Sequence, residues 1–187
     1  MSDASMVVAG AIACLGLAGA GSAFGTGLAA AAAVGSWKKC YAADKPAPFL
    51  LLSFVGAPIT QTLYGMILMF IMLGKTGVAG AGVPVLISGV FAGLAIGLSA
   101  LFQGRAGAAA CDAQAETNQG FTNYLAALGI VETVAIFVMV FALIAIGSLT
   151  KDAGAADALP AEEPAVIETV PDAGDPVPVV EDVAVED

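Results

Sequence analysis

The sequence predicts an all-α membrane protein with four transmembrane helices, arranged as two fused helical hairpins. Hydrophobic residues make up 59% of the 187 residues, and the mean hydropathy of +0.92 is too high for a water-soluble domain of this size. Four apolar segments each exceed the roughly 20 residues that cross a hydrocarbon core. None has the period-2 alternation of a β-barrel, so helices are the expected spanning elements.

Short polar breaks separate the four segments. The predicted breaks are Trp37–Ala47, Gly74–Gly82 and Cys111–Gly120, and the predicted spans are Ser5–Ser36, Pro48–Leu73, Val83–Ala110 and Phe121–Thr150. This divides the chain into a first hairpin at 1–75, a second hairpin at 76–150 and a tail at 151–187.

Lys and Arg collect in short loops on the cytoplasmic side of a membrane. The predicted loop between spans 1 and 2 contains Lys38, Lys39 and Lys45, and Arg105 lies near the end of the third span. Only Lys75 and Lys151 lie on the opposite side. We therefore expect a multi-pass protein whose loops between spans 1 and 2 and between spans 3 and 4 are cytoplasmic.

The net charge of -10 comes mostly from the tail, because eleven of the sixteen acidic residues lie between Asp152 and Asp187. The tail has no helical or strand period, and we expect it to be disordered. The membrane part is nearly neutral and has no basic stripe, which argues against nucleic-acid binding. With no histidine and only three scattered cysteines, the sequence offers no basis for a zinc or haem site, and no cofactor is expected.

An internal repeat supports the two-hairpin organisation. The segment that starts at Gly21 (GSAFGTGLAAAAAVGS) is similar to the one that starts at Ser99 (SALFQGRAGAAACDAQ). A second pair, GAPITQTLYGMIL from residue 56 and LGIVETVAIFVMV from residue 128, is also similar, and an offset of one residue places Gln61 opposite Glu132. The carboxylate of one hairpin is thus replaced by an amide in the other, so each chain offers one ionisable site at this position.

Glycines recur every four residues in spans 1 and 3. They are Gly21 and Gly25, continued by Ala29 and Ala33, and then Gly89, Gly93 and Gly97. Four residues return to nearly the same helix face, so each stripe allows another backbone to approach closely. In a ring of many copies, we expect spans 1 and 3 to form the inner wall and spans 2 and 4 to face outward. A single compact four-helix bundle is the alternative.

Glu132 is the candidate functional residue, because it lies about eleven residues into span 4, roughly 16 Å along the helix. A charge at that depth costs at least about 2.5 to 3.5 kcal/mol, so an intramembrane acid indicates function. The alternative is a protonated glutamic acid in a structural bond between helices.

Polar partners for Glu132 occur at matching depth. Thr60, Gln61 and Tyr64 lie close together on span 2, and Gln103 lies on span 3. Carboxylate, amide and hydroxyl oxygens suit a small hard cation, and their number favours sodium over a proton. Pro58 predicts a kink before Thr60 that would free a carbonyl near Ala57.

The chain resembles the duplicated proteolipid, known as the K or c subunit, of prokaryotic V-type and A-type rotary ATPases, particularly the sodium-translocating ones. The resemblance covers roughly Gly10 to Thr150 and is most specific in TQTLYG (Thr60–Gly65), FQGRAGAAA (Phe102–Ala110) and VET (Val131–Thr133). Thr62, where a glycine is common in that family, and the acidic tail depart from it.

The resemblance implies a homo-oligomeric rotor ring in a prokaryotic cell membrane, which turns against a stator subunit with an essential arginine. It also implies a central-stalk subunit at the cytoplasmic loops. The transported ion is Na⁺ or H⁺. The implied sodium ligands are Thr60, Gln61, Gln103 and Glu132 with the backbone carbonyl of Ala57, and Tyr64 is implied to hydrogen-bond the carboxylate.

The chain is not expected to be an enzyme by itself. It has no GxxxxGK[ST] phosphate loop, so ATP hydrolysis or synthesis would occur on other subunits. Two other functions stay open at this point. One is a proton-coupled rotor, and the other is a passive four-helix pore or membrane-organising proteolipid in which Glu132 lines a water path or is structural.

Overall fold

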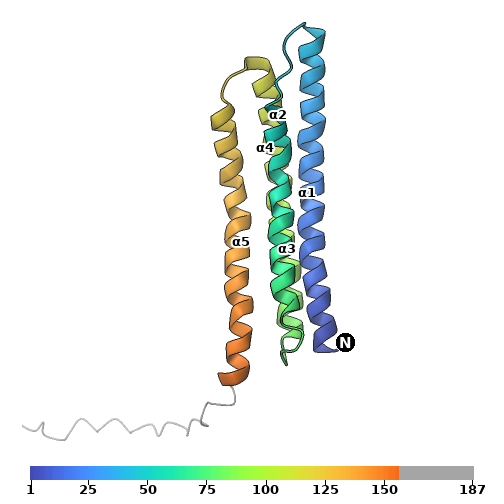
Figure 1. Cartoon of the computed structure of the whole chain (residues 1–187), viewed down its shortest axis with the longest axis vertical. Helices are drawn as coiled ribbons and strands as arrows, with labels where there is room; N and C mark the ends of the chain where they lie inside the picture. The colour runs from blue at the N-terminus through green and yellow to red at the C-terminus, as the bar shows by residue number, and fades with distance from the viewer. Residues whose placement is uncertain (156–187) are drawn as a thin grey trace, which may run out of the picture. The chain divides into compact units, whose positions relative to one another are not determined.

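The computed structural model describes residues 1–155, with side chains through residue 149. This part of the chain is helical throughout except for its connecting loops (Figure 1). The elements are α1 (Asp3–Ala42), α2 (Leu51–Gly56), the 3₁₀ turn η1 (Ala57–Ile59), α3 (Thr60–Leu73), α4 (Gly82–Thr117) and α5 (Phe121–Ala155). The acidic tail predicted to be disordered lies outside the described residues from position 156 onward, and its first five residues, 151–155, belong to α5.

Four of these helical units are long and apolar enough to cross a membrane. They are α1, the combined unit Leu51–Leu73, α4, and Phe121–Leu149 of α5. This confirms the predicted all-α membrane fold with four spans.

Both α1 and α4 continue into the predicted polar breaks. The breaks were expected to begin at Trp37 and Cys111, but the helices end at Ala42 and Thr117. The additional turns at the ends of α1 and α4 are polar, and ion pairs join them. The ammonium of Lys39 lies 2.7 Å from Asp112 and 3.6 Å from Glu116. The charged residues therefore belong to helical turns that project beyond the apolar layer, and not to a loop.

The helices α1 and α4 form the most closely packed pair. A Cβ atom added to Gly93 would lie 2.6 Å from the carbonyl oxygen of Cys14, and one added to Gly21 would overlap the backbone of Gly97. A Cβ atom added to Gly104 would likewise overlap the backbone of Gly25. The glycine stripes identified in the sequence therefore lie at this contact, where a side chain larger than hydrogen does not fit.

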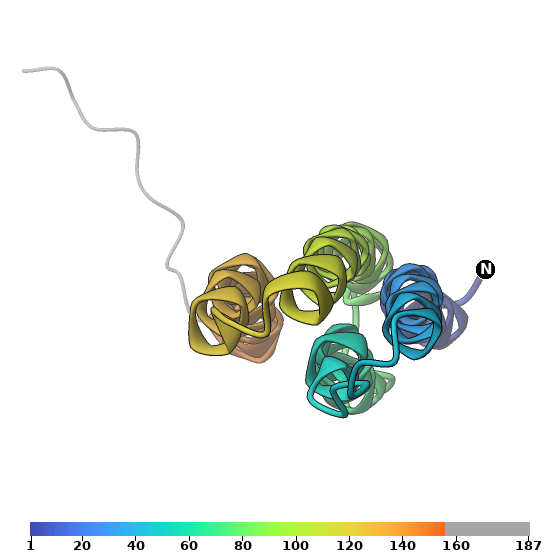
Figure 2. The same cartoon turned by 90° about the horizontal axis from the view of Figure 1, so that it is seen from above.

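The other two spans pack on this pair in different ways. Viewed along the helices (Figure 2), α3 lies beside the gap between α1 and α4, and α5 lies on the far side of α4 from α1. α5 is buried along one side only, and its opposite side exposes large apolar residues that include Ile130 (71%), Phe137 (61%) and Phe141 (66%). Those exposed faces require lipid or another protein.

The second span is interrupted where proline was expected to disturb it. Pro58 lies in η1, between α2 and α3, and is buried. The backbone N–H of Thr60 bonds the carbonyl of Ala57 in a three-residue turn, because the helix tightens to 3₁₀ geometry there. This turn directs Thr60 and the carbonyl of Ala57 to the same place.

Candidate functional site

Glu132 lies in α5 and is partly buried against α3 and α4. One carboxylate oxygen, Oε1, accepts hydrogen bonds from the hydroxyl of Thr60 at 2.6 Å and from the hydroxyl of Tyr64 at 2.7 Å. The other, Oε2, accepts one from Nε2 of Gln103 at 3.2 Å. Three side chains from two other helices thus converge on a single carboxylate.

The hydroxyl of Thr60 has more acceptors around it than it can satisfy. Its oxygen lies 2.6 Å from Glu132 Oε1, 3.0 Å from the carbonyl oxygen of Ala57 and 3.2 Å from Oε1 of Gln61. A hydroxyl has one hydrogen to donate. Four oxygen atoms therefore meet here, one of them from Thr60 itself, and the Thr60 hydroxyl has a single hydrogen to share among them. The result is a concentration of negative electrostatic potential at this point.

The two glutamines are fully buried and joined to each other. Gln61 donates through Nε2 to Oε1 of Gln103 at 2.7 Å, and Gln103 donates through Nε2 to the carbonyl of Leu128 at 3.0 Å. Gln103 therefore turns its nitrogen toward Glu132, whereas the ligand set that the resemblance implies would use its oxygen. Gln61 turns its oxygen toward Thr60, as that ligand set requires.

No lysine or arginine forms an ion pair with Glu132 within the described residues. Arg105, only two residues along α4 from Gln103, lies instead over the ring of Phe102, with its Cζ atom 5.8 Å from the ring centre. Among the described residues the carboxylate is met by hydrogen-bond donors and no cationic side chain, so a proton or a bound cation would neutralise its charge.

All the side chains singled out in the sequence as possible partners of Glu132 lie at this place. The structure brings together Thr60, Gln61 and Tyr64 from α3, Gln103 from α4 and Glu132 from α5, with the Ala57 carbonyl from η1.

One bond beside the site was not anticipated. The hydroxyl of Ser99 donates to the carbonyl of Val131 at 3.0 Å and joins α4 to α5 next to Glu132. Ser99 lies four residues before Gln103, on the same face of α4, and that spacing was the available signal.

Comparisons with known proteins connect the second hairpin to one family. Residues 79–145 match the family model that describes the C subunit of ATP synthase. The matched region spans α4 and most of α5 and includes Gln103 and Glu132, whereas Thr60, Gln61 and Tyr64 lie outside it. A comparison with curated proteins gives no match.

Proposed function

We propose, from the premise that residues 79–145 form a domain of the ATP synthase C-subunit family, that this chain is the membrane rotor component of a V-type or A-type rotary ATPase. In this proposal each chain carries one cation at Glu132, and rotation of a ring of such chains moves the cation across the membrane. Hydrolysis or synthesis of ATP takes place on other subunits.

The crowding of oxygen atoms around the Thr60 hydroxyl is the observation that supports a metal cation most directly. A proton on Glu132 would bridge one pair of oxygens and leave the remaining acceptors facing one another. A sodium ion among Glu132 Oε1, Thr60 Oγ1, Gln61 Oε1 and the Ala57 carbonyl would be attracted to all four. Hard oxygen donors are the ligands that suit such an ion. We therefore favour sodium over the proton as the transported ion.

Gln103 has a separate role in this proposal. Its amide hydrogens stabilise the ionised carboxylate after the cation leaves, since Nε2 lies 3.2 Å from Glu132 Oε2. Rotation about the terminal side-chain torsion, which has a broad energy profile, would exchange nitrogen for oxygen and give a bound cation a fifth ligand. That rotation would break the bond between Gln61 and Gln103.

The charge balance explains how ion binding would be coupled to rotation. With a cation bound, the carboxylate is neutralised and the site can pass through lipid, whereas an ionised carboxylate is tolerated only near water or a positive partner. The chain offers no such partner to Glu132 within its described residues. A stator arginine from another subunit would meet that need.

The exposed side of α5 supports assembly into a ring. Because large apolar residues cover that side, a neighbouring chain can bury part of it, and lipid can cover the remainder. In the arrangement that we propose, α1 and α4 form the inner wall, and α3 and α5 lie outside. The loops that follow the projecting ends of α1 and α4 are cytoplasmic and meet the central stalk.

The test is carbodiimide labelling of the whole chain in its native assembly. Dicyclohexylcarbodiimide reacts with protonated carboxyl groups in apolar surroundings, so a rotor of this type is labelled at Glu132, and sodium at neutral pH slows the labelling. A passive pore or organising proteolipid predicts no sodium-dependent protection. A proton-coupled rotor predicts labelling at Glu132 that sodium does not change.

A further inference from the structure

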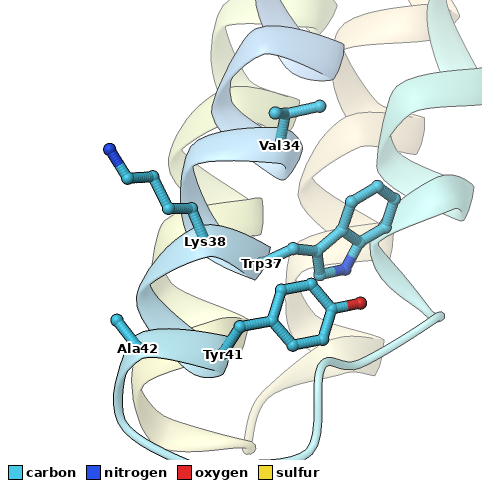
Figure 3. A pocket seen from close by; sticks show the side chains of 5 residues that line it. All are labelled: Val34, Trp37, Lys38, Tyr41 and Ala42. Atoms are coloured by element: carbon cyan, nitrogen blue, oxygen red, sulfur yellow. The ribbon is translucent and has the colours of Figure 1, made fainter.

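A surface pocket lies at the C-terminal end of α1, away from Glu132. It is lined by Val34, Trp37, Lys38, Tyr41 and Ala42, as Figure 3 shows. The rings of Trp37 and Tyr41 lie toward one side of the pocket, and Lys38 extends from the other. One cation and two aromatic rings thus surround an otherwise apolar surface.

Some polar groups of this pocket already have a hydrogen-bond or ion-pair partner within the chain, and others do not. The indole N–H of Trp37 donates to the carbonyl of Pro48 at 2.8 Å, which fixes the ring against the following loop. Lys38 forms no ion pair within the described part of the chain, although its neighbour Lys39 bonds both Asp112 and Glu116. Tyr41 is 69% exposed. The ammonium of Lys38 and the hydroxyl of Tyr41 are therefore available to a ligand.

The depth of the pocket can be measured along α1. Gly25 packs against Gly104, next to Gln103, and so lies near the level of Glu132. Val34 follows Gly25 by nine residues, or about 14 Å at 1.5 Å per residue, and Tyr41 follows it by sixteen residues, or about 24 Å. The hydrocarbon layer extends about 15 Å from the bilayer centre, and the headgroups reach a little over 20 Å. With Glu132 at mid-membrane, the pocket begins where the acyl chains end and continues through the headgroup layer.

A second marker agrees with this depth. Pro48, which accepts the bond from Trp37, lies three residues before Leu51, where the second span begins. Trp37 therefore lies at the level where the second span leaves the apolar layer. Tryptophan and tyrosine are enriched at this boundary, because each has an apolar ring and a polar tip.

We propose that this pocket binds an anionic phospholipid. The lipid phosphate bonds the ammonium of Lys38 and the hydroxyl of Tyr41, the glycerol backbone lies against the indole of Trp37, and an acyl chain continues over Val34. A cation near the headgroups attracts anionic lipid, and the free charge of Lys38 makes this the favoured lipid class. The proposal concerns the lipid boundary of the chain and holds whether or not Glu132 transports an ion.

The fluorescence of Trp37 provides a direct test, because it is the single tryptophan of the chain. The full chain is reconstituted in phosphatidylcholine vesicles with increasing fractions of phosphatidylglycerol brominated on its acyl chains. Bromine quenches an indole that it contacts, so the quenching curve gives the affinity of the pocket for phosphatidylglycerol relative to phosphatidylcholine. We expect a ratio of about five for the unsubstituted chain, which corresponds to about 1 kcal/mol for one lysine at an anionic surface.

Two substitutions make the test specific. Lys38→Gln removes the free ammonium from an exposed position and is expected to reduce the ratio about fivefold, to near one. Lys39→Gln makes the same change of charge one residue away, but removes an ammonium already bonded to Asp112 and Glu116, and should leave the ratio unchanged. A ratio near one in the unsubstituted chain would overturn the proposal. An equal loss of the ratio in both variants would also overturn it, because the preference for phosphatidylglycerol would then come from the general surface charge and not from the pocket.

Discussion

The hydroxyl of Thr60 lies 2.6 Å from the carboxylate oxygen Oε1 of Glu132 and joins the second span to the fourth in the middle of the chain's apolar layer. The same hydroxyl oxygen is within 3.2 Å of two further oxygens, from Ala57 and Gln61. Oxygens at such distances repel one another unless a hydrogen or a cation lies between them. This arrangement makes the role of each oxygen separately testable.

Removing the carboxylate should abolish transport without preventing assembly. Glu132→Gln keeps the size of the side chain and its ability to accept bonds from Thr60 and Tyr64, but it cannot become ionised. Uptake of ²²Na⁺ or of protons into vesicles that contain the complete ATPase should fall to background, while the ring keeps its size in native mass spectrometry. Glu116→Gln is the control, because Glu116 is exposed at the end of α4, and this variant should retain transport. Full transport by Glu132→Gln would exclude the assigned role.

Sodium should protect Glu132 against dicyclohexylcarbodiimide in a pH-dependent way. The reagent reacts with the protonated acid, whereas sodium binds the ionised form, so the two ions compete for one carboxylate. As pH falls, labelling should become faster and the sodium concentration for half-protection should rise. Mass spectrometry of the labelled chain measures both rate and position. Labelling at Glu132 that is insensitive to sodium at neutral pH would eliminate sodium as the cargo and leave a proton-coupled rotor.

The Thr60 hydroxyl should contribute to sodium affinity. Thr60→Val keeps the shape of the side chain but removes an oxygen from the cluster. We expect the sodium concentration for half-protection to rise about tenfold or more, which corresponds to a loss of at least about 1.4 kcal/mol. Thr62→Val is the matched control, because Thr62 lies two residues away and forms no hydrogen bond with Glu132. Equal affinities in the two variants would remove Thr60 from the proposed ligand set.

The close contact of α1 with α4 should make substitution at its glycines costly. In Gly93→Ala, the new Cβ atom would lie 2.6 Å from the carbonyl oxygen of Cys14, and backbone atoms cannot easily move away. We expect a loss of about 1 to 3 kcal/mol in the free energy of unfolding, measured in mixed detergent micelles.

Gly19 provides the matched control for that substitution. A Cβ atom at Gly19 would have no neighbour within 4 Å, so Gly19→Ala should change the stability of the isolated chain by less than about 1 kcal/mol, or increase it. If Gly93→Ala proved equally harmless, the two helices would be farther apart than described.

The number of spans and the type of fold could be predicted from the sequence because they depend on composition and length. The interruption near Pro58 was also predictable, since proline lacks the backbone donor that a helix needs. The ends of α1 and α4 were not. Polar residues such as Lys39 and Asp112 indicated a loop, and only their mutual contact explains why the helices continue.

The sequence was enough to predict which residues form the candidate site, but not which hydrogen bonds they make. Depth along each span was enough to group Gln61 and Gln103 with Glu132. It could not specify that the two glutamines bond each other, because that depends on how α3 and α4 are rotated in the fold. Nor could it specify which atom of Gln103 faces the carboxylate, because that depends on the hydrogen bonds that orient the amide.

The replacement of a carboxylate by Gln61 in the first hairpin has a mechanical consequence for the proposed rotor. Four helices supply one charge, so a revolution moves half as many ions as it would through a ring of equal circumference with an acid in every hairpin. For the same torque and angle, each ion then receives about twice the work. A low number of ions per revolution suits a rotary ATPase that pumps ions against a steep electrochemical gradient. It is less suited to a rotary ATPase that makes ATP from a shallow gradient.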